Sequence, residues 1–142
     1  MSLKRAAHSV WDCQYHLVWT PKRRRPVFVG DVAQRLDALL REIAEARDIE
    51  IVTLHVAEDH VHLLCSFAPR LSISQVVALL KSLSARALFA EFPHLRKRMW
   101  GNELWEGSYF VRTVGSNVDA AMVKFYIERH ANEKVEEAPE SQ

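Results

Sequence analysis

The sequence predicts an α+β domain with the element order β-α-β-β-α-β and one further C-terminal helix. This is a ferredoxin-like (RRM-like) split βαβ arrangement around an antiparallel sheet. Four stretches are rich in β-branched and aromatic residues, two helical patterns of apolar residues separate them, and each helical pattern opens on a capping box. Because this topology hosts both enzymes and RNA-binding modules, it does not choose a function by itself.

Each element follows from a local pattern. The first helix opens at Asp31, with Gln34 three residues later, and the second opens at Ser72, with Gln75 three residues later. Pro93 ends the second helix because proline cannot continue the hydrogen-bond ladder. The predicted strands cover residues 10–19, 49–56, 60–67 and 108–114. The predicted helices cover residues 31–48, 72–92 and 117–136.

Length and composition favour one globular domain. The chain has 142 residues, of which 49% are hydrophobic and 26% charged. We expect the domain to cover residues 1–136 and the acidic residues 137–142 to form a flexible tail. The apolar runs are too short to span a bilayer, no apolar leader follows the first basic residues, and both cysteines lie in strand-like runs. A cytoplasmic protein with reduced thiols and no membrane association is therefore expected.

The formal net charge of +1 hides an uneven distribution. The last ten residues hold four acids and one base, so the rest of the chain has a net charge of +4. Basic residues cluster in "PKRRRP" (21–26) and "LRKRMW" (95–100). Such clusters are typical of solvated loops and also of phosphate-binding surfaces.

Two histidines occupy an otherwise apolar strand, "DHVHLLCSF" (59–67). Side chains alternate along a strand, so His60 and His62 share one face and lie about 6.6 Å apart along it. Two neutral imidazoles at this spacing can converge on one metal ion. Two hydrogen-bonded core histidines, or a half-exposed edge strand, would give the same pattern, and the adjacent Asp59 would then be only a turn residue.

The last predicted helix supplies possible partners for this pair. In "FYIERH" (125–130), Tyr126 and His130 are four residues apart and therefore lie on one helical face. Each has an ordinary explanation, since Tyr126 could pack in the core and His130 could interact with the helix dipole. Together with the His-x-His strand, they also suit a nucleophile beside a metal.

That combination predicts phosphoryl transfer. A divalent cation, Mg²⁺ or the more nitrogen-tolerant Mn²⁺, would polarise a scissile phosphate. Tyr126 would attack the phosphorus, form a covalent phosphotyrosine and expel a sugar hydroxyl. This intermediate keeps the bond energy, so a strand could be rejoined without a nucleotide cofactor.

Several stretches resemble one family of enzymes. "DHVHLL" (59–64) is similar to the His-hydrophobic-His signature of the HUH endonucleases. Four further stretches resemble, in order, blocks of the single-tyrosine HUH transposases of bacterial insertion sequences, the IS200-like family. They are "YHLVWTPKRRRPVF" (15–28), "LLKSLSAR" (79–86), "LWEGSYFVRTVG" (104–115) and "FYIERH" (125–130). The resemblance covers about residues 8 to 132.

The resemblance implies a site and an activity. His60 and His62 would be metal ligands and Tyr126 the nucleophile. His130 stands where the family often has a glutamine as third ligand, and Arg24 stands where it often has a tyrosine. Members cut and rejoin single-stranded DNA at hairpin-marked element ends through a 5′-phosphotyrosine. They act as homodimers in which one subunit supplies the histidines and the other the tyrosine, and Gly115 is the candidate hinge.

The resemblance also implies a basic surface for the DNA hairpin. Nine basic residues are the candidates for it: Lys22, Arg23, Arg24, Arg25, Lys81, Arg86, Arg96, Lys97 and Arg98. Trp100 and Trp105 could stack on extruded bases or pack in the core, and packing is the preferred interpretation.

Three alternatives stay open at this point. A domesticated relative would use the same chemistry on repeated chromosomal hairpins associated with REP sequences. A non-catalytic nucleic-acid-binding module of the same topology would leave the His-x-His strand unexplained, and the aromatic RNA-binding motif of such modules is not found in the sequence. A metal hydrolase would use water as nucleophile and would not need the phenol of Tyr126.

Overall fold

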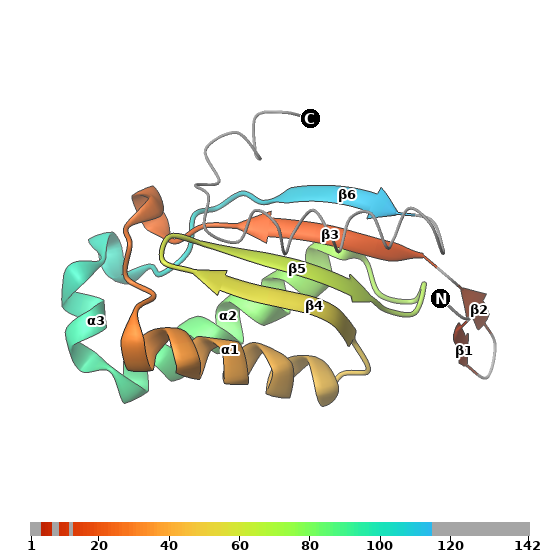
Figure 1. Ribbon diagram of the computed structural model, residues 1–142, viewed down its shortest axis with the longest axis horizontal. Helices are drawn as coiled ribbons and strands as arrows, with labels where there is room; N and C mark the ends of the chain where they lie inside the picture. Colours follow the sequence, from red (N-terminus) through yellow and green to blue (C-terminus); the bar gives the residue numbers. More distant parts are fainter. Residues whose placement is uncertain (1–3, 7–8, 12, 115–142) are drawn as a thin grey trace.

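The computed structural model describes residues 4–6, 9–11 and 13–114, which form one four-stranded antiparallel sheet, a small hairpin and three α-helices. Figure 1 shows α1 and α2 on the same face of the sheet and α3 at one end. The strands are β1 (Lys4–Ala6), β2 (Ser9–Trp11), β3 (Gln14–Trp19), β4 (Glu50–Ala57), β5 (His60–Ser66) and β6 (Phe110–Val114). The helices are η1 (Lys22–Arg24), α1 (Gly30–Glu45), α2 (Ile73–Glu91), α3 (Pro93–Arg98) and η2 (Trp100–Asn102).

The strand order β4-β5-β3-β6 confirms the predicted split βαβ topology. Strand β3 is central and pairs antiparallel with both β5 and β6, while β4 pairs with β5 across a two-residue turn. The predicted C-terminal helix, with Gly115, Tyr126 and His130, and the predicted tail lie outside the described residues. The domain boundary at residue 136 therefore stays a prediction.

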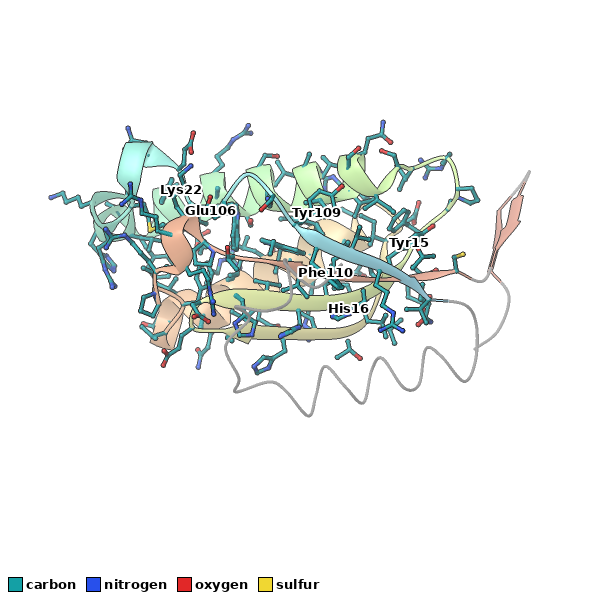
Figure 2. The ribbon with its side chains drawn as sticks, turned by 90° about the horizontal axis from the view of Figure 1, so that it is seen from above. Tyr15, His16, Lys22, Glu106, Tyr109 and Phe110 are labelled. Atoms are coloured by element: carbon teal, nitrogen blue, oxygen red, sulfur yellow. The ribbon has the colours of Figure 1, made fainter. Side chains whose placement is uncertain are left out.

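The two faces of the sheet carry different side chains. Leu17, Trp19 and Leu63 are buried in the main core with residues of α1 and α2. Their sequence neighbours point to the opposite face. In Figure 2, Tyr15 lies on the helix side of β3 and His16 on the other side. Because paired residues of antiparallel strands share a face, His16 and the β5 histidines lie together on the face of the sheet opposite α1 and α2.

The second helix begins as its sequence predicts. Ser72 is the N-cap of α2, its hydroxyl accepts the Gln75 amide at 3.0 Å, and the Gln75 side chain accepts the Ser72 amide at 2.9 Å. Within the described part of the chain, α2 is the helix whose length and composition would allow it to cross a membrane. Core helices pass the same test, and its apolar residues Val76, Leu80 and Leu88 are buried in the core.

The capping box predicted at Asp31 is wrong. Helix α1 begins at Gly30, its N-cap is Val29, and no side chain caps it. The backbone amide of Phe28 donates to the Glu58 carbonyl at 3.1 Å, which fixes where the chain enters the helix. Gly30 has φ of +57°, a conformation that glycine adopts without strain. Asp31 instead lies in the first turn, where its charge suits the helix dipole.

Other boundaries also differ from the prediction. The stretch 10–19 is divided between β2 and β3, and β2 pairs with β1 in a hairpin that the sequence pattern did not indicate. Residues 95–98, predicted as loop, belong to α3, which starts at Pro93. The last strand begins at Phe110 rather than 108, and the Ser108 carbonyl instead accepts from the Lys81 ammonium at 3.0 Å.

Candidate active site

The β5 histidines lie together in a buried position. His60 is 1% exposed and His62 is 5% exposed, and their ring centroids are 4.6 Å apart with nearly perpendicular rings. His60 is the first residue of β5, directly after the β4–β5 turn, and His62 follows on the same face of the strand. The predicted shared face is therefore confirmed.

Asp59 determines the hydrogen bonding of His60. Its Oδ1 atom lies 2.8 Å from His60 Nδ1. Burial lowers the pKa of His60, although the hydrogen bond and charge of Asp59 oppose that shift. A neutral imidazole that donates from Nδ1 has its lone pair on Nε2, the atom a metal ion requires. In the described part of the chain, Nε2 of His60 is buried and has no hydrogen-bond partner. Asp59 is thus more than a turn residue.

His16 is a third histidine at this site, and its position in the first predicted strand gave no sign of this role. Its ring is stacked on that of His62 with centroids 6.0 Å apart, and its edge contact with Phe110 is at 5.6 Å. Burial, and secondarily the charge of Arg112, lower the pKa of His16 to about 4, so its imidazole is neutral at physiological pH. Figure 2 shows His16 and Phe110 on adjacent strands.

The described residues by themselves do not complete a metal site. Among residues 4–6, 9–11 and 13–114, no three His, Cys, Asp or Glu side chains are arranged to hold one ion. His55 is paired with His62 on β4, but it does not complete such a set. His60 and His62 could fill two positions of a metal site, which would then need further ligands from other residues. His130, the predicted third ligand, lies outside the described residues.

Arg24 was predicted to contact DNA, and the structure places it beside the histidines. Its Nη2 atom lies 3.1 Å from Asp59 Oδ2, and its side chain is 24% exposed. The guanidinium therefore holds the carboxylate that contacts His60. This role depends on a residue distant in sequence, so the run "PKRRRP" gave no signal for it.

Four of the other basic candidates surround a groove of about 520 Å³ at the α3 end of the molecule: Lys22, Lys81, Arg86 and Arg96. The groove lies between α2, α3 and the segment 102–107. Arg86 and Arg96 are exposed, and the guanidinium of Arg96 lies 4.7 Å from the ring centre of Phe89. The basic clusters, which are distant in sequence, thus meet at one surface.

The two lysines of the groove have internal partners. Lys22 forms an ion pair with Glu103 at 2.8 Å. The ammonium of Lys81 donates to the carbonyls of Glu106 at 2.7 Å and Ser108 at 3.0 Å. Burial lowers the pKa of Lys81, although Glu106 opposes that shift. Lys81 therefore fastens the segment before β6 to α2.

The remaining candidates do not line the groove. Arg23 is exposed, and its backbone amide donates to the Glu106 carboxylate at 2.8 Å. Figure 2 shows Glu106 and Lys22 close together beside α3. Arg25 is half-buried, while Lys97 and Arg98 are exposed on α3. Their contacts with DNA stay predictions.

Trp105 packs in the core, which was the preferred interpretation of this residue over base stacking. Its indole N–H donates to the Lys81 carbonyl at 3.1 Å and to the Ser84 hydroxyl at 3.2 Å. Its ring contacts Trp19 and Phe28 with centroids 5.9 Å and 5.2 Å away. The side chain of Trp100 lies outside what the structure describes, so the alternatives for it stay open.

The comparisons with known proteins agree on one family. The family model described as "Transposase IS200 like" matches residues 9–130. The chain is 39% identical to the ISDra2 transposase of Deinococcus radiodurans over 133 residues, covering 94% of this chain and 95% of the relative. It is 33% identical to the transposase of insertion sequence IS200 from Salmonella typhimurium over 130 residues, covering 92% of this chain and 84% of the relative.

Two solved structures are also similar. One is described as a candidate transposase from Deinococcus radiodurans R1, with 41% identity and a TM-score of 0.73, covering 91% of this chain and 98% of that one. The other is a REP-associated tyrosine transposase bound to a REP hairpin, with a TM-score of 0.62. Its identity is 14%, covering 90% of this chain and 72% of that one, so it supports the fold alone.

Proposed function

The chain belongs to the IS200-like transposase family, and on this premise we propose a specific reaction for it. It is a metal-dependent single-stranded DNA endonuclease and strand transferase, which cuts and rejoins hairpin-marked ends through a 5′-phosphotyrosine. The observation that carries the proposal is the buried pair of His60 and His62, with Asp59 on Nδ1 of His60. A histidine that only packs in the core would be expected to pair both ring nitrogens, whereas Nε2 of His60 is buried without a partner among the described residues.

His60 and His62 are proposed to hold the metal, with His130 as the third protein ligand. Bound there, Mg²⁺ or Mn²⁺ would supply Lewis acidity toward the scissile phosphate. Imidazole ligands favour Mn²⁺ over Mg²⁺, because Mg²⁺ prefers oxygen. The neutral state of His60 leaves its lone pair free for this role without loss of a proton.

Tyr126 is proposed as the nucleophile. Its phenolic oxygen gives up a proton and attacks the phosphorus, forming the phosphotyrosine bond. The bond from phosphorus to the 3′ oxygen breaks, and that oxygen leaves as a hydroxyl after taking up a proton. A 3′-hydroxyl from another DNA end then attacks the same phosphorus and releases the tyrosine. The reaction conserves the number of phosphodiester bonds, so no nucleotide cofactor is required.

The basic groove is proposed to bind the backbone of the DNA. Arg86 and Arg96 are exposed at its rim, where a guanidinium can form two hydrogen bonds with one phosphate. The other basic candidates would add long-range attraction around it. Such binding should fall with rising salt, since each neutralised phosphate releases counterions.

A homodimer with shared sites is proposed as the active form. Gly115 follows β6 directly, so a helix beginning there could be directed toward another subunit. Among the described strands, β4 and β6 are the edges of the sheet, and an edge offers backbone groups that another strand can pair with. Tyr126 of one subunit would then meet His60 and His62 of the other.

The decisive test of the chemistry is Tyr126→Phe. A labelled single-stranded element end is incubated with protein and Mn²⁺, and cleavage and the covalent protein–DNA adduct are followed on denaturing gels. Tyr15→Phe is the matched control, because Tyr15 lies on the opposite face of the sheet from the histidines. We expect Tyr126→Phe to abolish both products while hairpin binding persists. Cleavage by Tyr126→Phe would favour a water-using hydrolase.

Shared sites are tested by mixing two inactive proteins. Tyr126→Phe is mixed with the His60→Ala/His62→Ala double variant, and subunit exchange is verified with two different tags. A mixed dimer regains one site with wild-type tyrosine and wild-type histidines, so partial cleavage should return. A mixture that exchanges subunits yet cuts nothing would show that each site is built within one chain.

A further inference from the structure

We propose that Arg24 and Asp59 are positioning residues that set the tautomer and orientation of His60, so that the basic loop 21–26 is part of the metal site. The contacts form a continuous line. Arg24 Nη2 lies 3.1 Å from one carboxylate oxygen of Asp59, and the other carboxylate oxygen lies 2.8 Å from His60 Nδ1. The inference rests on the proposed metal-binding function of His60.

The two oxygens of the Asp59 carboxylate contact different partners: Oδ2 accepts from Arg24, and Oδ1 accepts from His60. A carboxylate held on one side by a cation cannot turn away from the imidazole on its other side. It therefore keeps accepting from Nδ1, and the proton stays on that nitrogen. The lone pair of His60 is then on Nε2 and is directed away from the turn. Without Arg24, the carboxylate would lose this restraint and the imidazole could adopt the other tautomer.

The loop that carries Arg24 has an unusual backbone. Arg23 and Arg24 have φ values of 58° and 52°, a left-handed conformation that is costly for residues with a Cβ atom. Several hydrogen bonds hold this loop, three of them at 2.8 Å. The amide of Lys22 donates to the Leu104 carbonyl at 2.8 Å, that of Arg23 to the Glu106 carboxylate at 2.8 Å, and that of Arg24 to the Pro21 carbonyl at 2.8 Å.

The same segment holds the β4–β5 turn at a second point. The amide of Phe28 donates to the Glu58 carbonyl at 3.1 Å, and Glu58 is the residue before Asp59. The turn is thus restrained through its backbone at Glu58 and through its side chain at Asp59. With Arg23 and Arg24 in this left-handed conformation, the Arg24 guanidinium lies against Asp59.

The proposal separates Arg24 from the other basic candidates. A residue that only contacts phosphate would change DNA affinity and leave the metal site intact. A positioning residue would change metal affinity in the absence of DNA. Loss of an outer partner of a metal-ligating histidine typically weakens metal binding by about 10- to 100-fold.

The experiment uses the full chain and three variants: Arg24→Gln, Asp59→Asn and, as control, Arg41→Gln. Arg41 forms an ion pair with Asp37 at 2.7 Å on the surface of α1, so its loss removes the same type of interaction away from the site. Mn²⁺ affinity is measured by calorimetry without DNA. The tautomer of His60 is read from the ¹⁵N shifts of its ring nitrogens in metal-free protein, and circular dichroism verifies folding.

In wild-type protein and Arg41→Gln we expect His60 to carry its proton on Nδ1. In Arg24→Gln and Asp59→Asn we expect a mixture of tautomers and Mn²⁺ binding weaker by about 10- to 100-fold. If Arg24→Gln does not fold, Asp59→Asn tests the same line of contacts alone. An unchanged tautomer with Mn²⁺ affinity within twofold of wild type would overturn the proposal.

The two readouts distinguish this proposal from the proposed function. If wild-type protein binds no Mn²⁺, the proposed function fails, but the tautomer of His60 still shows whether Arg24 and Asp59 set it. If Arg24→Gln weakens hairpin binding while the tautomer and Mn²⁺ affinity are unchanged, Arg24 is a phosphate contact and the positioning role is wrong.

Discussion

Replacement of Trp105 tests whether this aromatic residue supports the fold or stacks on DNA bases. The side chain is 8% exposed and packs against Trp19 and Phe28. Replacing a buried tryptophan by alanine removes its apolar contacts and leaves a cavity, which typically costs about 3–5 kcal/mol of unfolding free energy. We therefore expect Trp105→Ala to lower the free energy of unfolding by about that amount.

Trp105→Phe separates the ring from its hydrogen bonds. The phenyl ring keeps most of the packing, while the Lys81 carbonyl and the Ser84 hydroxyl both lose the indole donor. The Ser84 hydroxyl still donates to the Lys81 carbonyl at 3.1 Å, so neither group is left without any hydrogen bond. The expected cost is about 1 kcal/mol, the usual net value of one hydrogen bond.

The assay is urea unfolding followed by far-ultraviolet circular dichroism, with single-stranded DNA affinity measured on folded protein. Val111→Ala is the control, because Val111 is 36% exposed on β6 and its replacement should cost less than about 1 kcal/mol. Base stacking on an aromatic side chain is worth about 1–3 kcal/mol of binding. If Trp105→Ala lost that much DNA affinity but less than about 1 kcal/mol of stability, the packing argument would be refuted.

Three further predictions concern other parts of the molecule. Burial raises the pKa of the Cys65 thiol to about 12. As the pH rises, the thiol of the unfolded chain therefore loses its proton before that of the folded chain. The free energy of unfolding should fall by about 1.4 kcal/mol per pH unit from about pH 9 up to pH 12. Unfolding measured across this pH range should show no such fall from this thiol in Cys65→Ala. Ser72→Ala removes the cap of α2 and should cost about 1 kcal/mol in urea unfolding, whereas Ser82→Ala, at an exposed position of the same helix, should cost less; equal losses would contradict the capping argument. Arg86→Gln and Arg96→Gln should each lower the slope of log affinity for single-stranded DNA against log salt by about 0.7, and an unchanged slope would place the DNA elsewhere.

The position of the nucleophile remains a prediction of the sequence. Tyr126, His130 and Gly115 follow the last described strand, and their roles come from helical spacing and from family resemblance. The described residues contribute the other half of the proposed site, which is the histidine face of β5. The tests with Tyr126→Phe and with mixed subunits address the part that the described fold does not include.

The sequence by itself determined the features that depend on neighbouring residues. Strand alternation was sufficient to place His60 and His62 on one face, and the Ser-x-x-Gln spacing was sufficient to identify Ser72 as the N-cap of α2. The element order followed from the same short-range patterns, because apolar periodicity and capping act within one or two turns or a single strand.

Tertiary structure alone decided the features that depend on distant segments. The register between β3 and β5 brings His16 onto His62. The fold of the basic loop turns Arg24 from a general phosphate candidate into the partner of Asp59. The backbone hydrogen bond from Phe28 to Glu58 joins two distant segments just before α1, which begins at Gly30 and not at a capping box on Asp31. Each case has the same physical reason: strand register and loop packing choose the partner of a polar side chain, and local sequence preferences do not encode that choice.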